Sequence, residues 1–203
     1  MCDSPVNTAL AAGRVLLAPH PDHIVHEEAF YALTLGVRRR SGREDALPVI
    51  LPGRALVACR PAAGESVRLE GQLRTYNRAQ ADGGRLQIRL FVRSLAPCPP
   101  GEEENRICLT GFLCRPPVYR TTPLGRQIAD LLLAVNRAYH KSDYVPLIAW
   151  GGDARRAAAL AVGDKIAVEG RLQSRLYHKQ LPGGALQERT AYEVSLTGFS
   201  RAE

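Results

Sequence analysis

Hydrophobic and polar side chains alternate along much of the chain, which is the pattern of β-strands that bury one face. In the stretch 67–74, aliphatic residues alternate with charged and amide side chains, and the stretch 86–93 follows the same period of two. The stretch 166–172 repeats the pattern later in the chain. We therefore predict that both halves of the chain consist mainly of strands.

Turn signals and one helical segment separate these strands. Asp82-Gly83-Gly84 and the segment 181–184 predict hairpin turns. Residues 152–160 predict a short helix that ends at Val162-Gly163. About five strands and one short helix per hundred residues indicate an all-β class built from small barrels, not an α/β sheet.

A change in composition divides the chain into near-equal halves. The segment 97–104 contains three prolines and the run Glu102-Glu103-Glu104. Proline cannot donate to a strand ladder, and three like charges repel one another into solvent. We therefore predict a linker at 97–104 between an N-terminal domain, 1–96, and a C-terminal domain, 105–203.

The two halves contain an internal repeat with a period of about 100 residues. Residues 64–75, GESVRLEGQLRT, align without a gap with residues 163–174, GDKIAVEGRLQS. More weakly, 31–38 parallels 130–137, and 47–51 parallels 145–149 after a shift of one residue. We interpret the chain as two copies of one small domain.

Composition narrows the class of protein. The net charge is +7 and 45% of the residues are hydrophobic, so a packed core is expected and a polyanion is a suitable partner. No run approaches the roughly 18 apolar residues of a membrane helix, and the start lacks the pattern of a signal peptide. We expect a cytoplasmic, nucleoid-associated protein. The five cysteines form no C-x-x-C pair and predict reduced, structural thiols.

The second copy contains five segments that point to a known family. They are NRICLTG at 105–111, RTTPLG at 120–125, LAVNR at 133–137, YVPLIAW at 144–150 and VEGRLQSR at 168–175. Residues 105–198 thereby resemble the bacterial single-stranded DNA-binding protein family, whose members have the five-stranded OB-fold. The first copy is similar to a diverged member. The resemblance implies two tandem OB-fold barrels that bind single-stranded DNA without sequence preference and without catalysis, in replication, recombination or repair.

The resemblance also implies a binding site in the second copy. Bases would stack on Tyr144, Trp150 and Tyr177, while basic side chains contact phosphates. Tyr144 and Trp150 are six residues apart, so on a regular strand they share one face, with Val145, Leu147 and Ala149 on the other. A buried position for these aromatic rings stays open as an alternative. The predicted phosphate contacts are Arg120, Arg126, Arg137, Lys141, Arg171, Arg175 and Lys179.

The first copy lacks the stacking set. Ala46 stands opposite Tyr144, Pro52 opposite Trp150 and Arg78 opposite Tyr177. Either this copy forms an auxiliary phosphate groove with weak stacking, or it is kept for pairing with the second copy. The auxiliary binding residues we predict are Arg38, Arg40, Arg74, Tyr76, Arg78 and Phe91.

Other interpretations concern partners. Family members assemble through their OB domains, so we expect either a homodimer with four domains or a pseudo-dimeric monomer. The last residues, TGFSRAE, contain no acidic tip of the kind that recruits other proteins in the family. The alternatives are an OB-fold module for protein interaction or primosome assembly, and RNA binding, which uses the same stacking and phosphate contacts.

An enzyme is disfavoured. The segment LLAPHPDH at 16–23 is similar to the zinc-binding turn of an N-deacetylase family, and His20, His23 and His26 suit zinc. His23 replaces the second aspartate of that motif, and no H-x-x-H follows beyond His26. We therefore expect a polar loop here, no metal, no cofactor and no catalytic residue.

Overall fold

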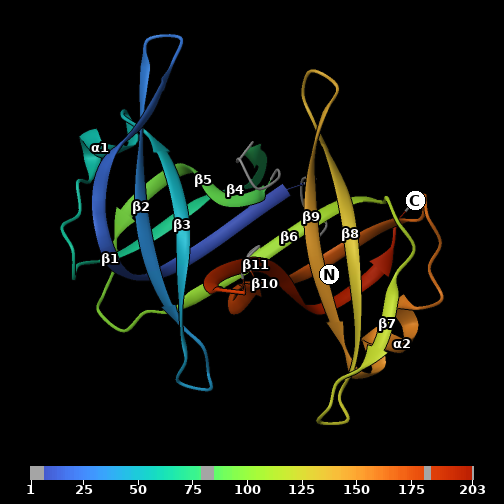
Figure 1. Cartoon of the computed structure of the whole chain (residues 1–203). Coiled ribbons are helices and arrows are strands. Elements are labelled where there is room, and N and C mark those ends of the chain that lie inside the picture. The colour runs from blue at the N-terminus through green and yellow to red at the C-terminus, as the bar shows by residue number, and fades with distance from the viewer. Residues whose placement is uncertain (1–6, 79–84, 181–183, 203) are drawn as a thin grey trace.

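The computed structural model describes residues 7–78, 85–180 and 184–202 (Figure 1). The N-terminal half contains β1 (Asn7–Val25), β2 (Glu28–Arg38), β3 (Glu44–Pro52), α1 (Ala55–Ala58), β4 (Ser66–Arg78) and β5 (Arg85–Pro97). The C-terminal half contains β6 (Glu104–Leu113), β7 (Val118–Thr121), β8 (Gln127–Arg137), β9 (Lys141–Trp150), α2 (Gly151–Ala157), β10 (Lys165–Gln180) and β11 (Leu186–Arg201).

Each half closes into a five-stranded barrel. In the N-terminal half, β1 pairs with β2 and β4, and β3 joins β2 to β5, which returns to β4. In the C-terminal half, β6, β8, β9, β11 and β10 close the same circuit, with β7 added outside β8. The predicted class, all-β with two tandem five-stranded barrels, is confirmed. No helix in the described part of the chain is long and apolar enough to cross a membrane.

A single antiparallel pair joins the barrels into one sheet. β1 pairs with β6, with Asn7 opposite Leu109, Ala9 opposite Ile107 and Ala11 opposite Asn105. Asn7 and Asn105 stand at equivalent positions of the two copies, so the pairing is symmetric about Ala9 and Ile107. The repeat of the sequence is therefore a two-fold arrangement in space, and the two lobes in Figure 1 face each other across it.

The same two asparagines tie down the long strands of their own barrels. The Asn7 side chain accepts a hydrogen bond from the backbone N of Leu73 at 2.8 Å and donates one to its carbonyl at 2.7 Å. Asn105 makes the equivalent pair with Leu172, at 2.9 and 2.8 Å. Beyond these contacts, β4 with β5 and β10 with β11 extend from the barrels as two hairpins, which we call the β4 arm and the β10 arm.

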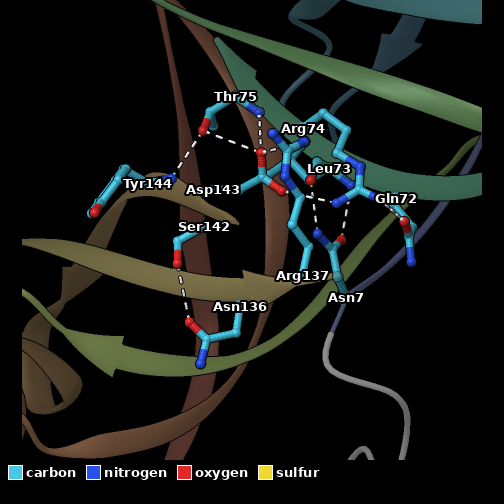
Figure 2. A network of polar contacts seen from close by, with 10 residues as sticks. All are labelled: Asn7, Gln72, Leu73, Arg74, Thr75, Asn136, Arg137, Ser142, Asp143 and Tyr144. Atoms are coloured by element: carbon cyan, nitrogen blue, oxygen red, sulfur yellow. Dashed lines mark hydrogen bonds and ion pairs between the residues drawn. The ribbon is translucent and has the colours of Figure 1, made fainter. Parts of the chain in front are cut away.

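Each arm is held against the opposite barrel by a buried aspartate, and Figure 2 shows the cluster around one of them, Asp143. Asp143 of β9 is fully buried and accepts hydrogen bonds from the Thr75 backbone N at 2.8 Å and from Arg74 at 3.0 Å. Thr75 Oγ1 in turn accepts a hydrogen bond from the Tyr144 backbone N at 2.9 Å. The β4 arm is thereby fixed to the C-terminal barrel.

The equivalent contact fixes the β10 arm to the N-terminal barrel. Asp45 of β3 is 1% exposed and accepts hydrogen bonds from the backbone N and the hydroxyl of Ser174, at 2.8 and 2.9 Å. Arg39 donates two hydrogen bonds to the same carboxylate, both at 2.6 Å. We call these two clusters the Asp45 clamp and the Asp143 clamp.

The pairing corrects one detail of the repeat. Gly36 lies opposite Ala46 in β3, and Ala134 lies opposite Tyr144 in β9. Since Ala46 and Tyr144 are equivalent, Gly36 corresponds to Ala134, one residue away from the alignment of 31–38 with 130–137. The predicted helix at 152–160 is shorter and starts earlier, at Gly151–Ala157. The predicted turn 82–84 and residues 181–183 of the predicted turn 181–184 lie outside the described residues.

The linker region also differs from its prediction. β5 continues to Pro97, and the glutamates contact the N-terminal barrel instead of extending into solvent. Glu102 and Glu104 form ion pairs with Arg68, and Glu103 accepts a hydrogen bond from the Arg38 backbone N at 2.7 Å. Neighbouring cations thus offset the repulsion between the three carboxylates.

The prediction of reduced thiols holds for three cysteines and is wrong for one. Cys59, Cys98 and Cys114 are free, and burial raises the pKa of each thiol. Cys108 on β6 is disulfide-bonded. Spacing alone could not indicate this bond because none of the five cysteines forms a short paired motif.

Closure of the second barrel depends on a glycine. A Cβ at Gly111 would lie 2.3 Å from the carbonyl oxygen of Ala134, where β6 meets β8. We expect Gly111→Ala to lower the free energy of unfolding by about 1–3 kcal/mol in urea denaturation. Gly152→Ala is the control because a Cβ there meets no atom within 4 Å and a helical alanine is favoured. Equal stability of the two variants would contradict this role.

The Asp45 clamp predicts acid sensitivity. Burial by itself would raise the pKa of Asp45, but the hydrogen bonds from Arg39 and Ser174 outweigh it and hold the pKa below 3.8. Its stabilisation is therefore complete above the unfolded pKa and is lost as the pH falls through the lower folded pKa. We expect urea midpoints of Asp45→Asn to fall less steeply than wild type between about pH 4 and pH 2. Asp153→Asn, at an exposed ion pair, should keep the wild-type profile.

Candidate nucleic-acid interface

The outward side of β9 presents the two predicted stacking residues. Tyr144 and Trp150 are 46% and 39% exposed, whereas Val145, Leu147 and Ala149 are buried in the barrel. The predicted division of this strand is confirmed, and the buried alternative for the two rings is excluded. Ile148 differs from the pattern because it lies on the outward side yet is 5% exposed.

The indole of Trp150 is held in place by its neighbour strand. β9 and β11 pair in parallel, with Ile148 opposite Ser195. The Trp150 Nε1 donates a hydrogen bond to Ser195 Oγ at 3.0 Å. The ring is thus oriented at its polar atom while a large part of its surface stays accessible. Such a ring can stack on a base without first losing side-chain freedom.

Tyr177 lies on the β10 arm beside a cavity between the two halves. The cavity has a volume of about 630 Å³ and is lined by both arms. Pro48 and Pro146, which occupy equivalent positions on β3 and β9, both line it. The Arg175 guanidinium lies 6.0 Å from the centroid of the Tyr177 ring. We call this space the central cavity.

Three of the predicted phosphate contacts are engaged within the protein. Arg74 and Arg137 face the Asp143 carboxylate at 3.0 and 3.6 Å. Arg120 pairs with Asp130 at 2.9 Å. The structure thus gives Arg74 and Arg137 a structural role, and Arg120 would have to leave Asp130 to bind phosphate.

Other predicted basic residues are exposed. Lys141 and Arg126 are exposed at the ends of β9 and β8, and Arg175 is exposed on the β10 arm. The side chains of Lys179 and Arg78 lie outside the described residues. Among the predicted contacts, the exposed cations are therefore Arg175 on the arm and Arg126 and Lys141 at opposite ends of the β8–β9 pair.

A second cavity gathers basic residues that the sequence assigned to different copies. It measures about 680 Å³ and is lined by Arg38 at the end of β2, by Arg40 just after β2 and by Arg171 on β10. Glu103 and Glu169 line the same space and reduce its positive charge. Although Arg171 shares a strand with Tyr177, the two side chains line different cavities.

Tyr76 belongs to the N-terminal copy but stands at the C-terminal barrel. It is 40% exposed, and burial of the remainder raises the pKa of its hydroxyl. The adjacent Thr75 binds both Asp143 and the backbone N of Tyr144. The β4 arm therefore brings Tyr76 to the region of the predicted stacking residues, a placement that sequence reasoning missed.

Glu193 on β11 is a further residue that sequence reasoning missed. Burial raises its pKa, partly offset by the positive charge of Arg175, with Asp130 also close enough to raise it. It lies two residues from Ser195, which holds Trp150, and therefore on the same side of the strand. A carboxylate at this place opposes the approach of a polyanion when it is ionised.

The histidines of the enzyme alternative lie along the β1–β2 hairpin. His23 Nδ1 lies 2.6 Å from Asp22 Oδ2, and its ring stacks on Phe30. Within the described residues, no group of three or more histidine, cysteine or acidic side chains is placed to hold a metal ion. The zinc alternative therefore gains no support from this arrangement.

Comparison with known proteins assigns the C-terminal half. The family model described as "Single-strand binding protein family" matches residues 104–201. This half of the chain is therefore similar to the single-strand binding protein family. The match covers the barrel that carries Tyr144, Trp150 and Tyr177.

Individual relatives agree with this assignment. Single-stranded DNA-binding protein 1 of Staphylococcus aureus is 37% identical over 37% of this chain and 50% of that protein. Single-stranded DNA-binding protein A of Bacillus subtilis is 36% identical over 37% of this chain and 48% of that protein. The chain thus spans about half the length of these curated relatives.

A solved structure matches both halves. The crystal structure of the single-stranded DNA-binding protein from Thermus aquaticus superposes with a TM-score of 0.74 at 24% identity. The match covers 97% of this chain and 93% of that chain. At this identity the likeness establishes the fold alone, here over both halves of the chain.

Proposed function

We propose that the chain binds single-stranded DNA, with bases stacking on the outward side of β9 and in the central cavity. The observation that carries the proposal is the state of Trp150, which is oriented by Ser195 yet 39% exposed. A stacked base contributes roughly 1–3 kcal/mol in proteins that bind single strands. The net charge of +7 and the exposed Arg175 and Lys141 favour a polyanion.

The arrangement supports binding without sequence preference. The groups offered by β9 and the arms are aromatic faces and flexible cations, which any base and any phosphate can use. Duplex DNA hides its base faces, so it can use only the cations. The role in replication, recombination or repair, the absence of catalysis and the assembly into a homodimer remain predictions from the resemblance. Light scattering of the purified chain tests the last of these.

Fluorescence of the single tryptophan, Trp150, tests the proposal. We expect an unstructured thymine oligonucleotide to quench this emission, and we expect affinity to fall linearly with salt on logarithmic axes. Trp150→Ala should weaken binding about 5-fold to 100-fold in a mobility-shift assay, since one stack is lost. The control is Phe112→Ala on β6, whose ring is 40% exposed and lines neither cavity.

Three outcomes decide between the alternatives. Quenching with much weaker duplex binding supports the proposal. Equal affinity for a matched uridine RNA would favour the RNA alternative over a DNA-specific role. Absence of both quenching and mobility shift at low salt would overturn nucleic-acid binding and leave the protein-interaction alternative.

Glu193 predicts that binding strengthens in mild acid. Its raised pKa means that the carboxylate becomes neutral at a higher pH than an exposed glutamate, which removes a negative charge beside Trp150 and Arg175. We expect Glu193→Gln to increase affinity at neutral pH and to flatten the rise in affinity that follows when the pH is lowered. Asp153 on α2 lines neither cavity, so Asp153→Asn serves as the charge-matched control. An unchanged pH profile in Glu193→Gln would contradict this role.

A further inference from the structure

The N-terminal barrel has aromatic rings at places where the C-terminal barrel has none. β3 pairs with β5 at Ile50 and Phe91, and β9 pairs with β11 at Ile148 and Ser195. Phe91 therefore occupies the position of Ser195. In the same way, Phe30 lies opposite Pro52 as Ile128 lies opposite Trp150. β3 has Pro52 where β9 has Trp150, but the two strands beside β3 carry rings that the second copy lacks, Phe30 on β2 and Phe91 on β5.

These rings form a stacked column with a third member. The rings of His23 and Phe30 are parallel within 8°, with centroids 4.9 Å apart. Phe30 and Phe91 follow at 5.9 Å with a tilt of 41°. The two phenylalanines are half-buried, whereas the His23 side chain is 45% exposed. The column is therefore partly buried in the barrel at Phe30 and Phe91, and its exposed end is His23.

A cation stands beside the column where the other barrel has an acid. Arg89 lies two residues before Phe91, on the same side of β5, at the position that corresponds to Glu193 of β11. The Asp22 carboxylate contacts both Arg89 and His23. Its Oδ1 lies 2.9 Å from a guanidinium nitrogen of Arg89, and its Oδ2 lies 2.6 Å from His23 Nδ1. Burial would raise the pKa of Asp22, but hydrogen bonds from His23 and Arg89 lower it, so Asp22 is ionised at neutral pH.

Arg89 links the column to the proposed interface. It lines the central cavity together with Tyr177, although the two residues come from different copies. A single strand that stacks on Tyr177 and crosses the cavity therefore reaches Arg89, and Phe91 lies two residues further along the same side of β5.

We propose that His23, Phe30 and Phe91 form a second base-stacking site in the N-terminal barrel, with Arg89 as its phosphate contact. The inference rests on the proposed function, since it extends the path of the same single strand. Asp22 orients Arg89 and His23 in the free protein and competes with the phosphate for them. The N-terminal copy is thus a binding domain whose stacking rings have moved to β2, β5 and the β1–β2 hairpin.

The test uses long oligonucleotides, since only a long strand reaches both sites. We expect the exposed-site variant His23→Ala to weaken binding of a long thymine oligonucleotide about 5-fold or more. It should shorten the length occluded per protein on poly(dT), while maximal quenching of Trp150 stays unchanged. Cross-linking with 5-iodouracil oligonucleotides should label peptides that contain His23, Phe30 or Phe91. Phe91→Leu keeps an apolar side chain and should reproduce the loss.

A charge-matched pair sharpens the test. Asp22→Asn releases Arg89 and His23 and should increase affinity for the long oligonucleotide. Asp153→Asn on α2 changes the net charge equally but should have a much smaller effect. Unchanged affinity and occluded length in His23→Ala and Phe91→Leu, with no cross-link in these peptides while Trp150 is still quenched, would overturn the second site alone. Absence of binding by the wild-type protein would instead overturn the proposed function and this inference together.

Discussion

Two buried carboxylates determine how this molecule is assembled. An ionised aspartate away from water is costly unless it is paired and hydrogen-bonded, and removing one partner of a buried pair costs about 3–5 kcal/mol. Asp143 finds its partners in Arg74 and Thr75 of the other barrel, and Asp45 finds Ser174 of the other barrel. Each barrel therefore contains a buried carboxylate whose hydrogen bonds are completed by the arm of the opposite barrel, in addition to the contacts that Arg39 makes with Asp45 and Arg137 with Asp143 inside each barrel. The two barrels form one unit for this reason, beyond the pairing of β1 with β6.

The two clamps also determine which residues form the candidate interface. Because Thr75 and Ser174 are fixed, the residues that follow them on β4 and β10 stand over the opposite barrel. Tyr76 thus reaches the surroundings of Tyr144, and Tyr177 lines a cavity shared with Pro48 of the first copy. The interface is composite, so neither copy presents its whole surface alone. A description of one binding copy with one auxiliary copy is too simple for this geometry.

The sequence was informative wherever the cause was local. Alternation along β9 predicted which side of the strand carries Tyr144 and Trp150, and the repeat predicted two barrels. It did not indicate contacts between residues that are distant in the chain. Arg74 was predicted to contact phosphate, and nothing near it in sequence indicates that it pairs with the buried carboxylate of Asp143. Phe30 and His23 were missed because they occupy positions with no stacking residue in the second copy.

The two copies have diverged unevenly, and the physical reason is visible in the clamps. Polar residues buried in the described part of the chain are Asn7, Asp45, Thr75, Asp143 and Ser195. The first four lie in contacts that recur in both copies, with Asn105 and Ser174 as the counterparts of Asn7 and Thr75. Substitution there would leave a buried donor or acceptor without a partner. The outward sides of β3, β5, β9 and β11 carry no such requirement. Ser195 holds Trp150 in one copy, whereas Phe91 stacks on Phe30 in the other, so the internal contacts constrain assembly while the surface sides are free to present different rings.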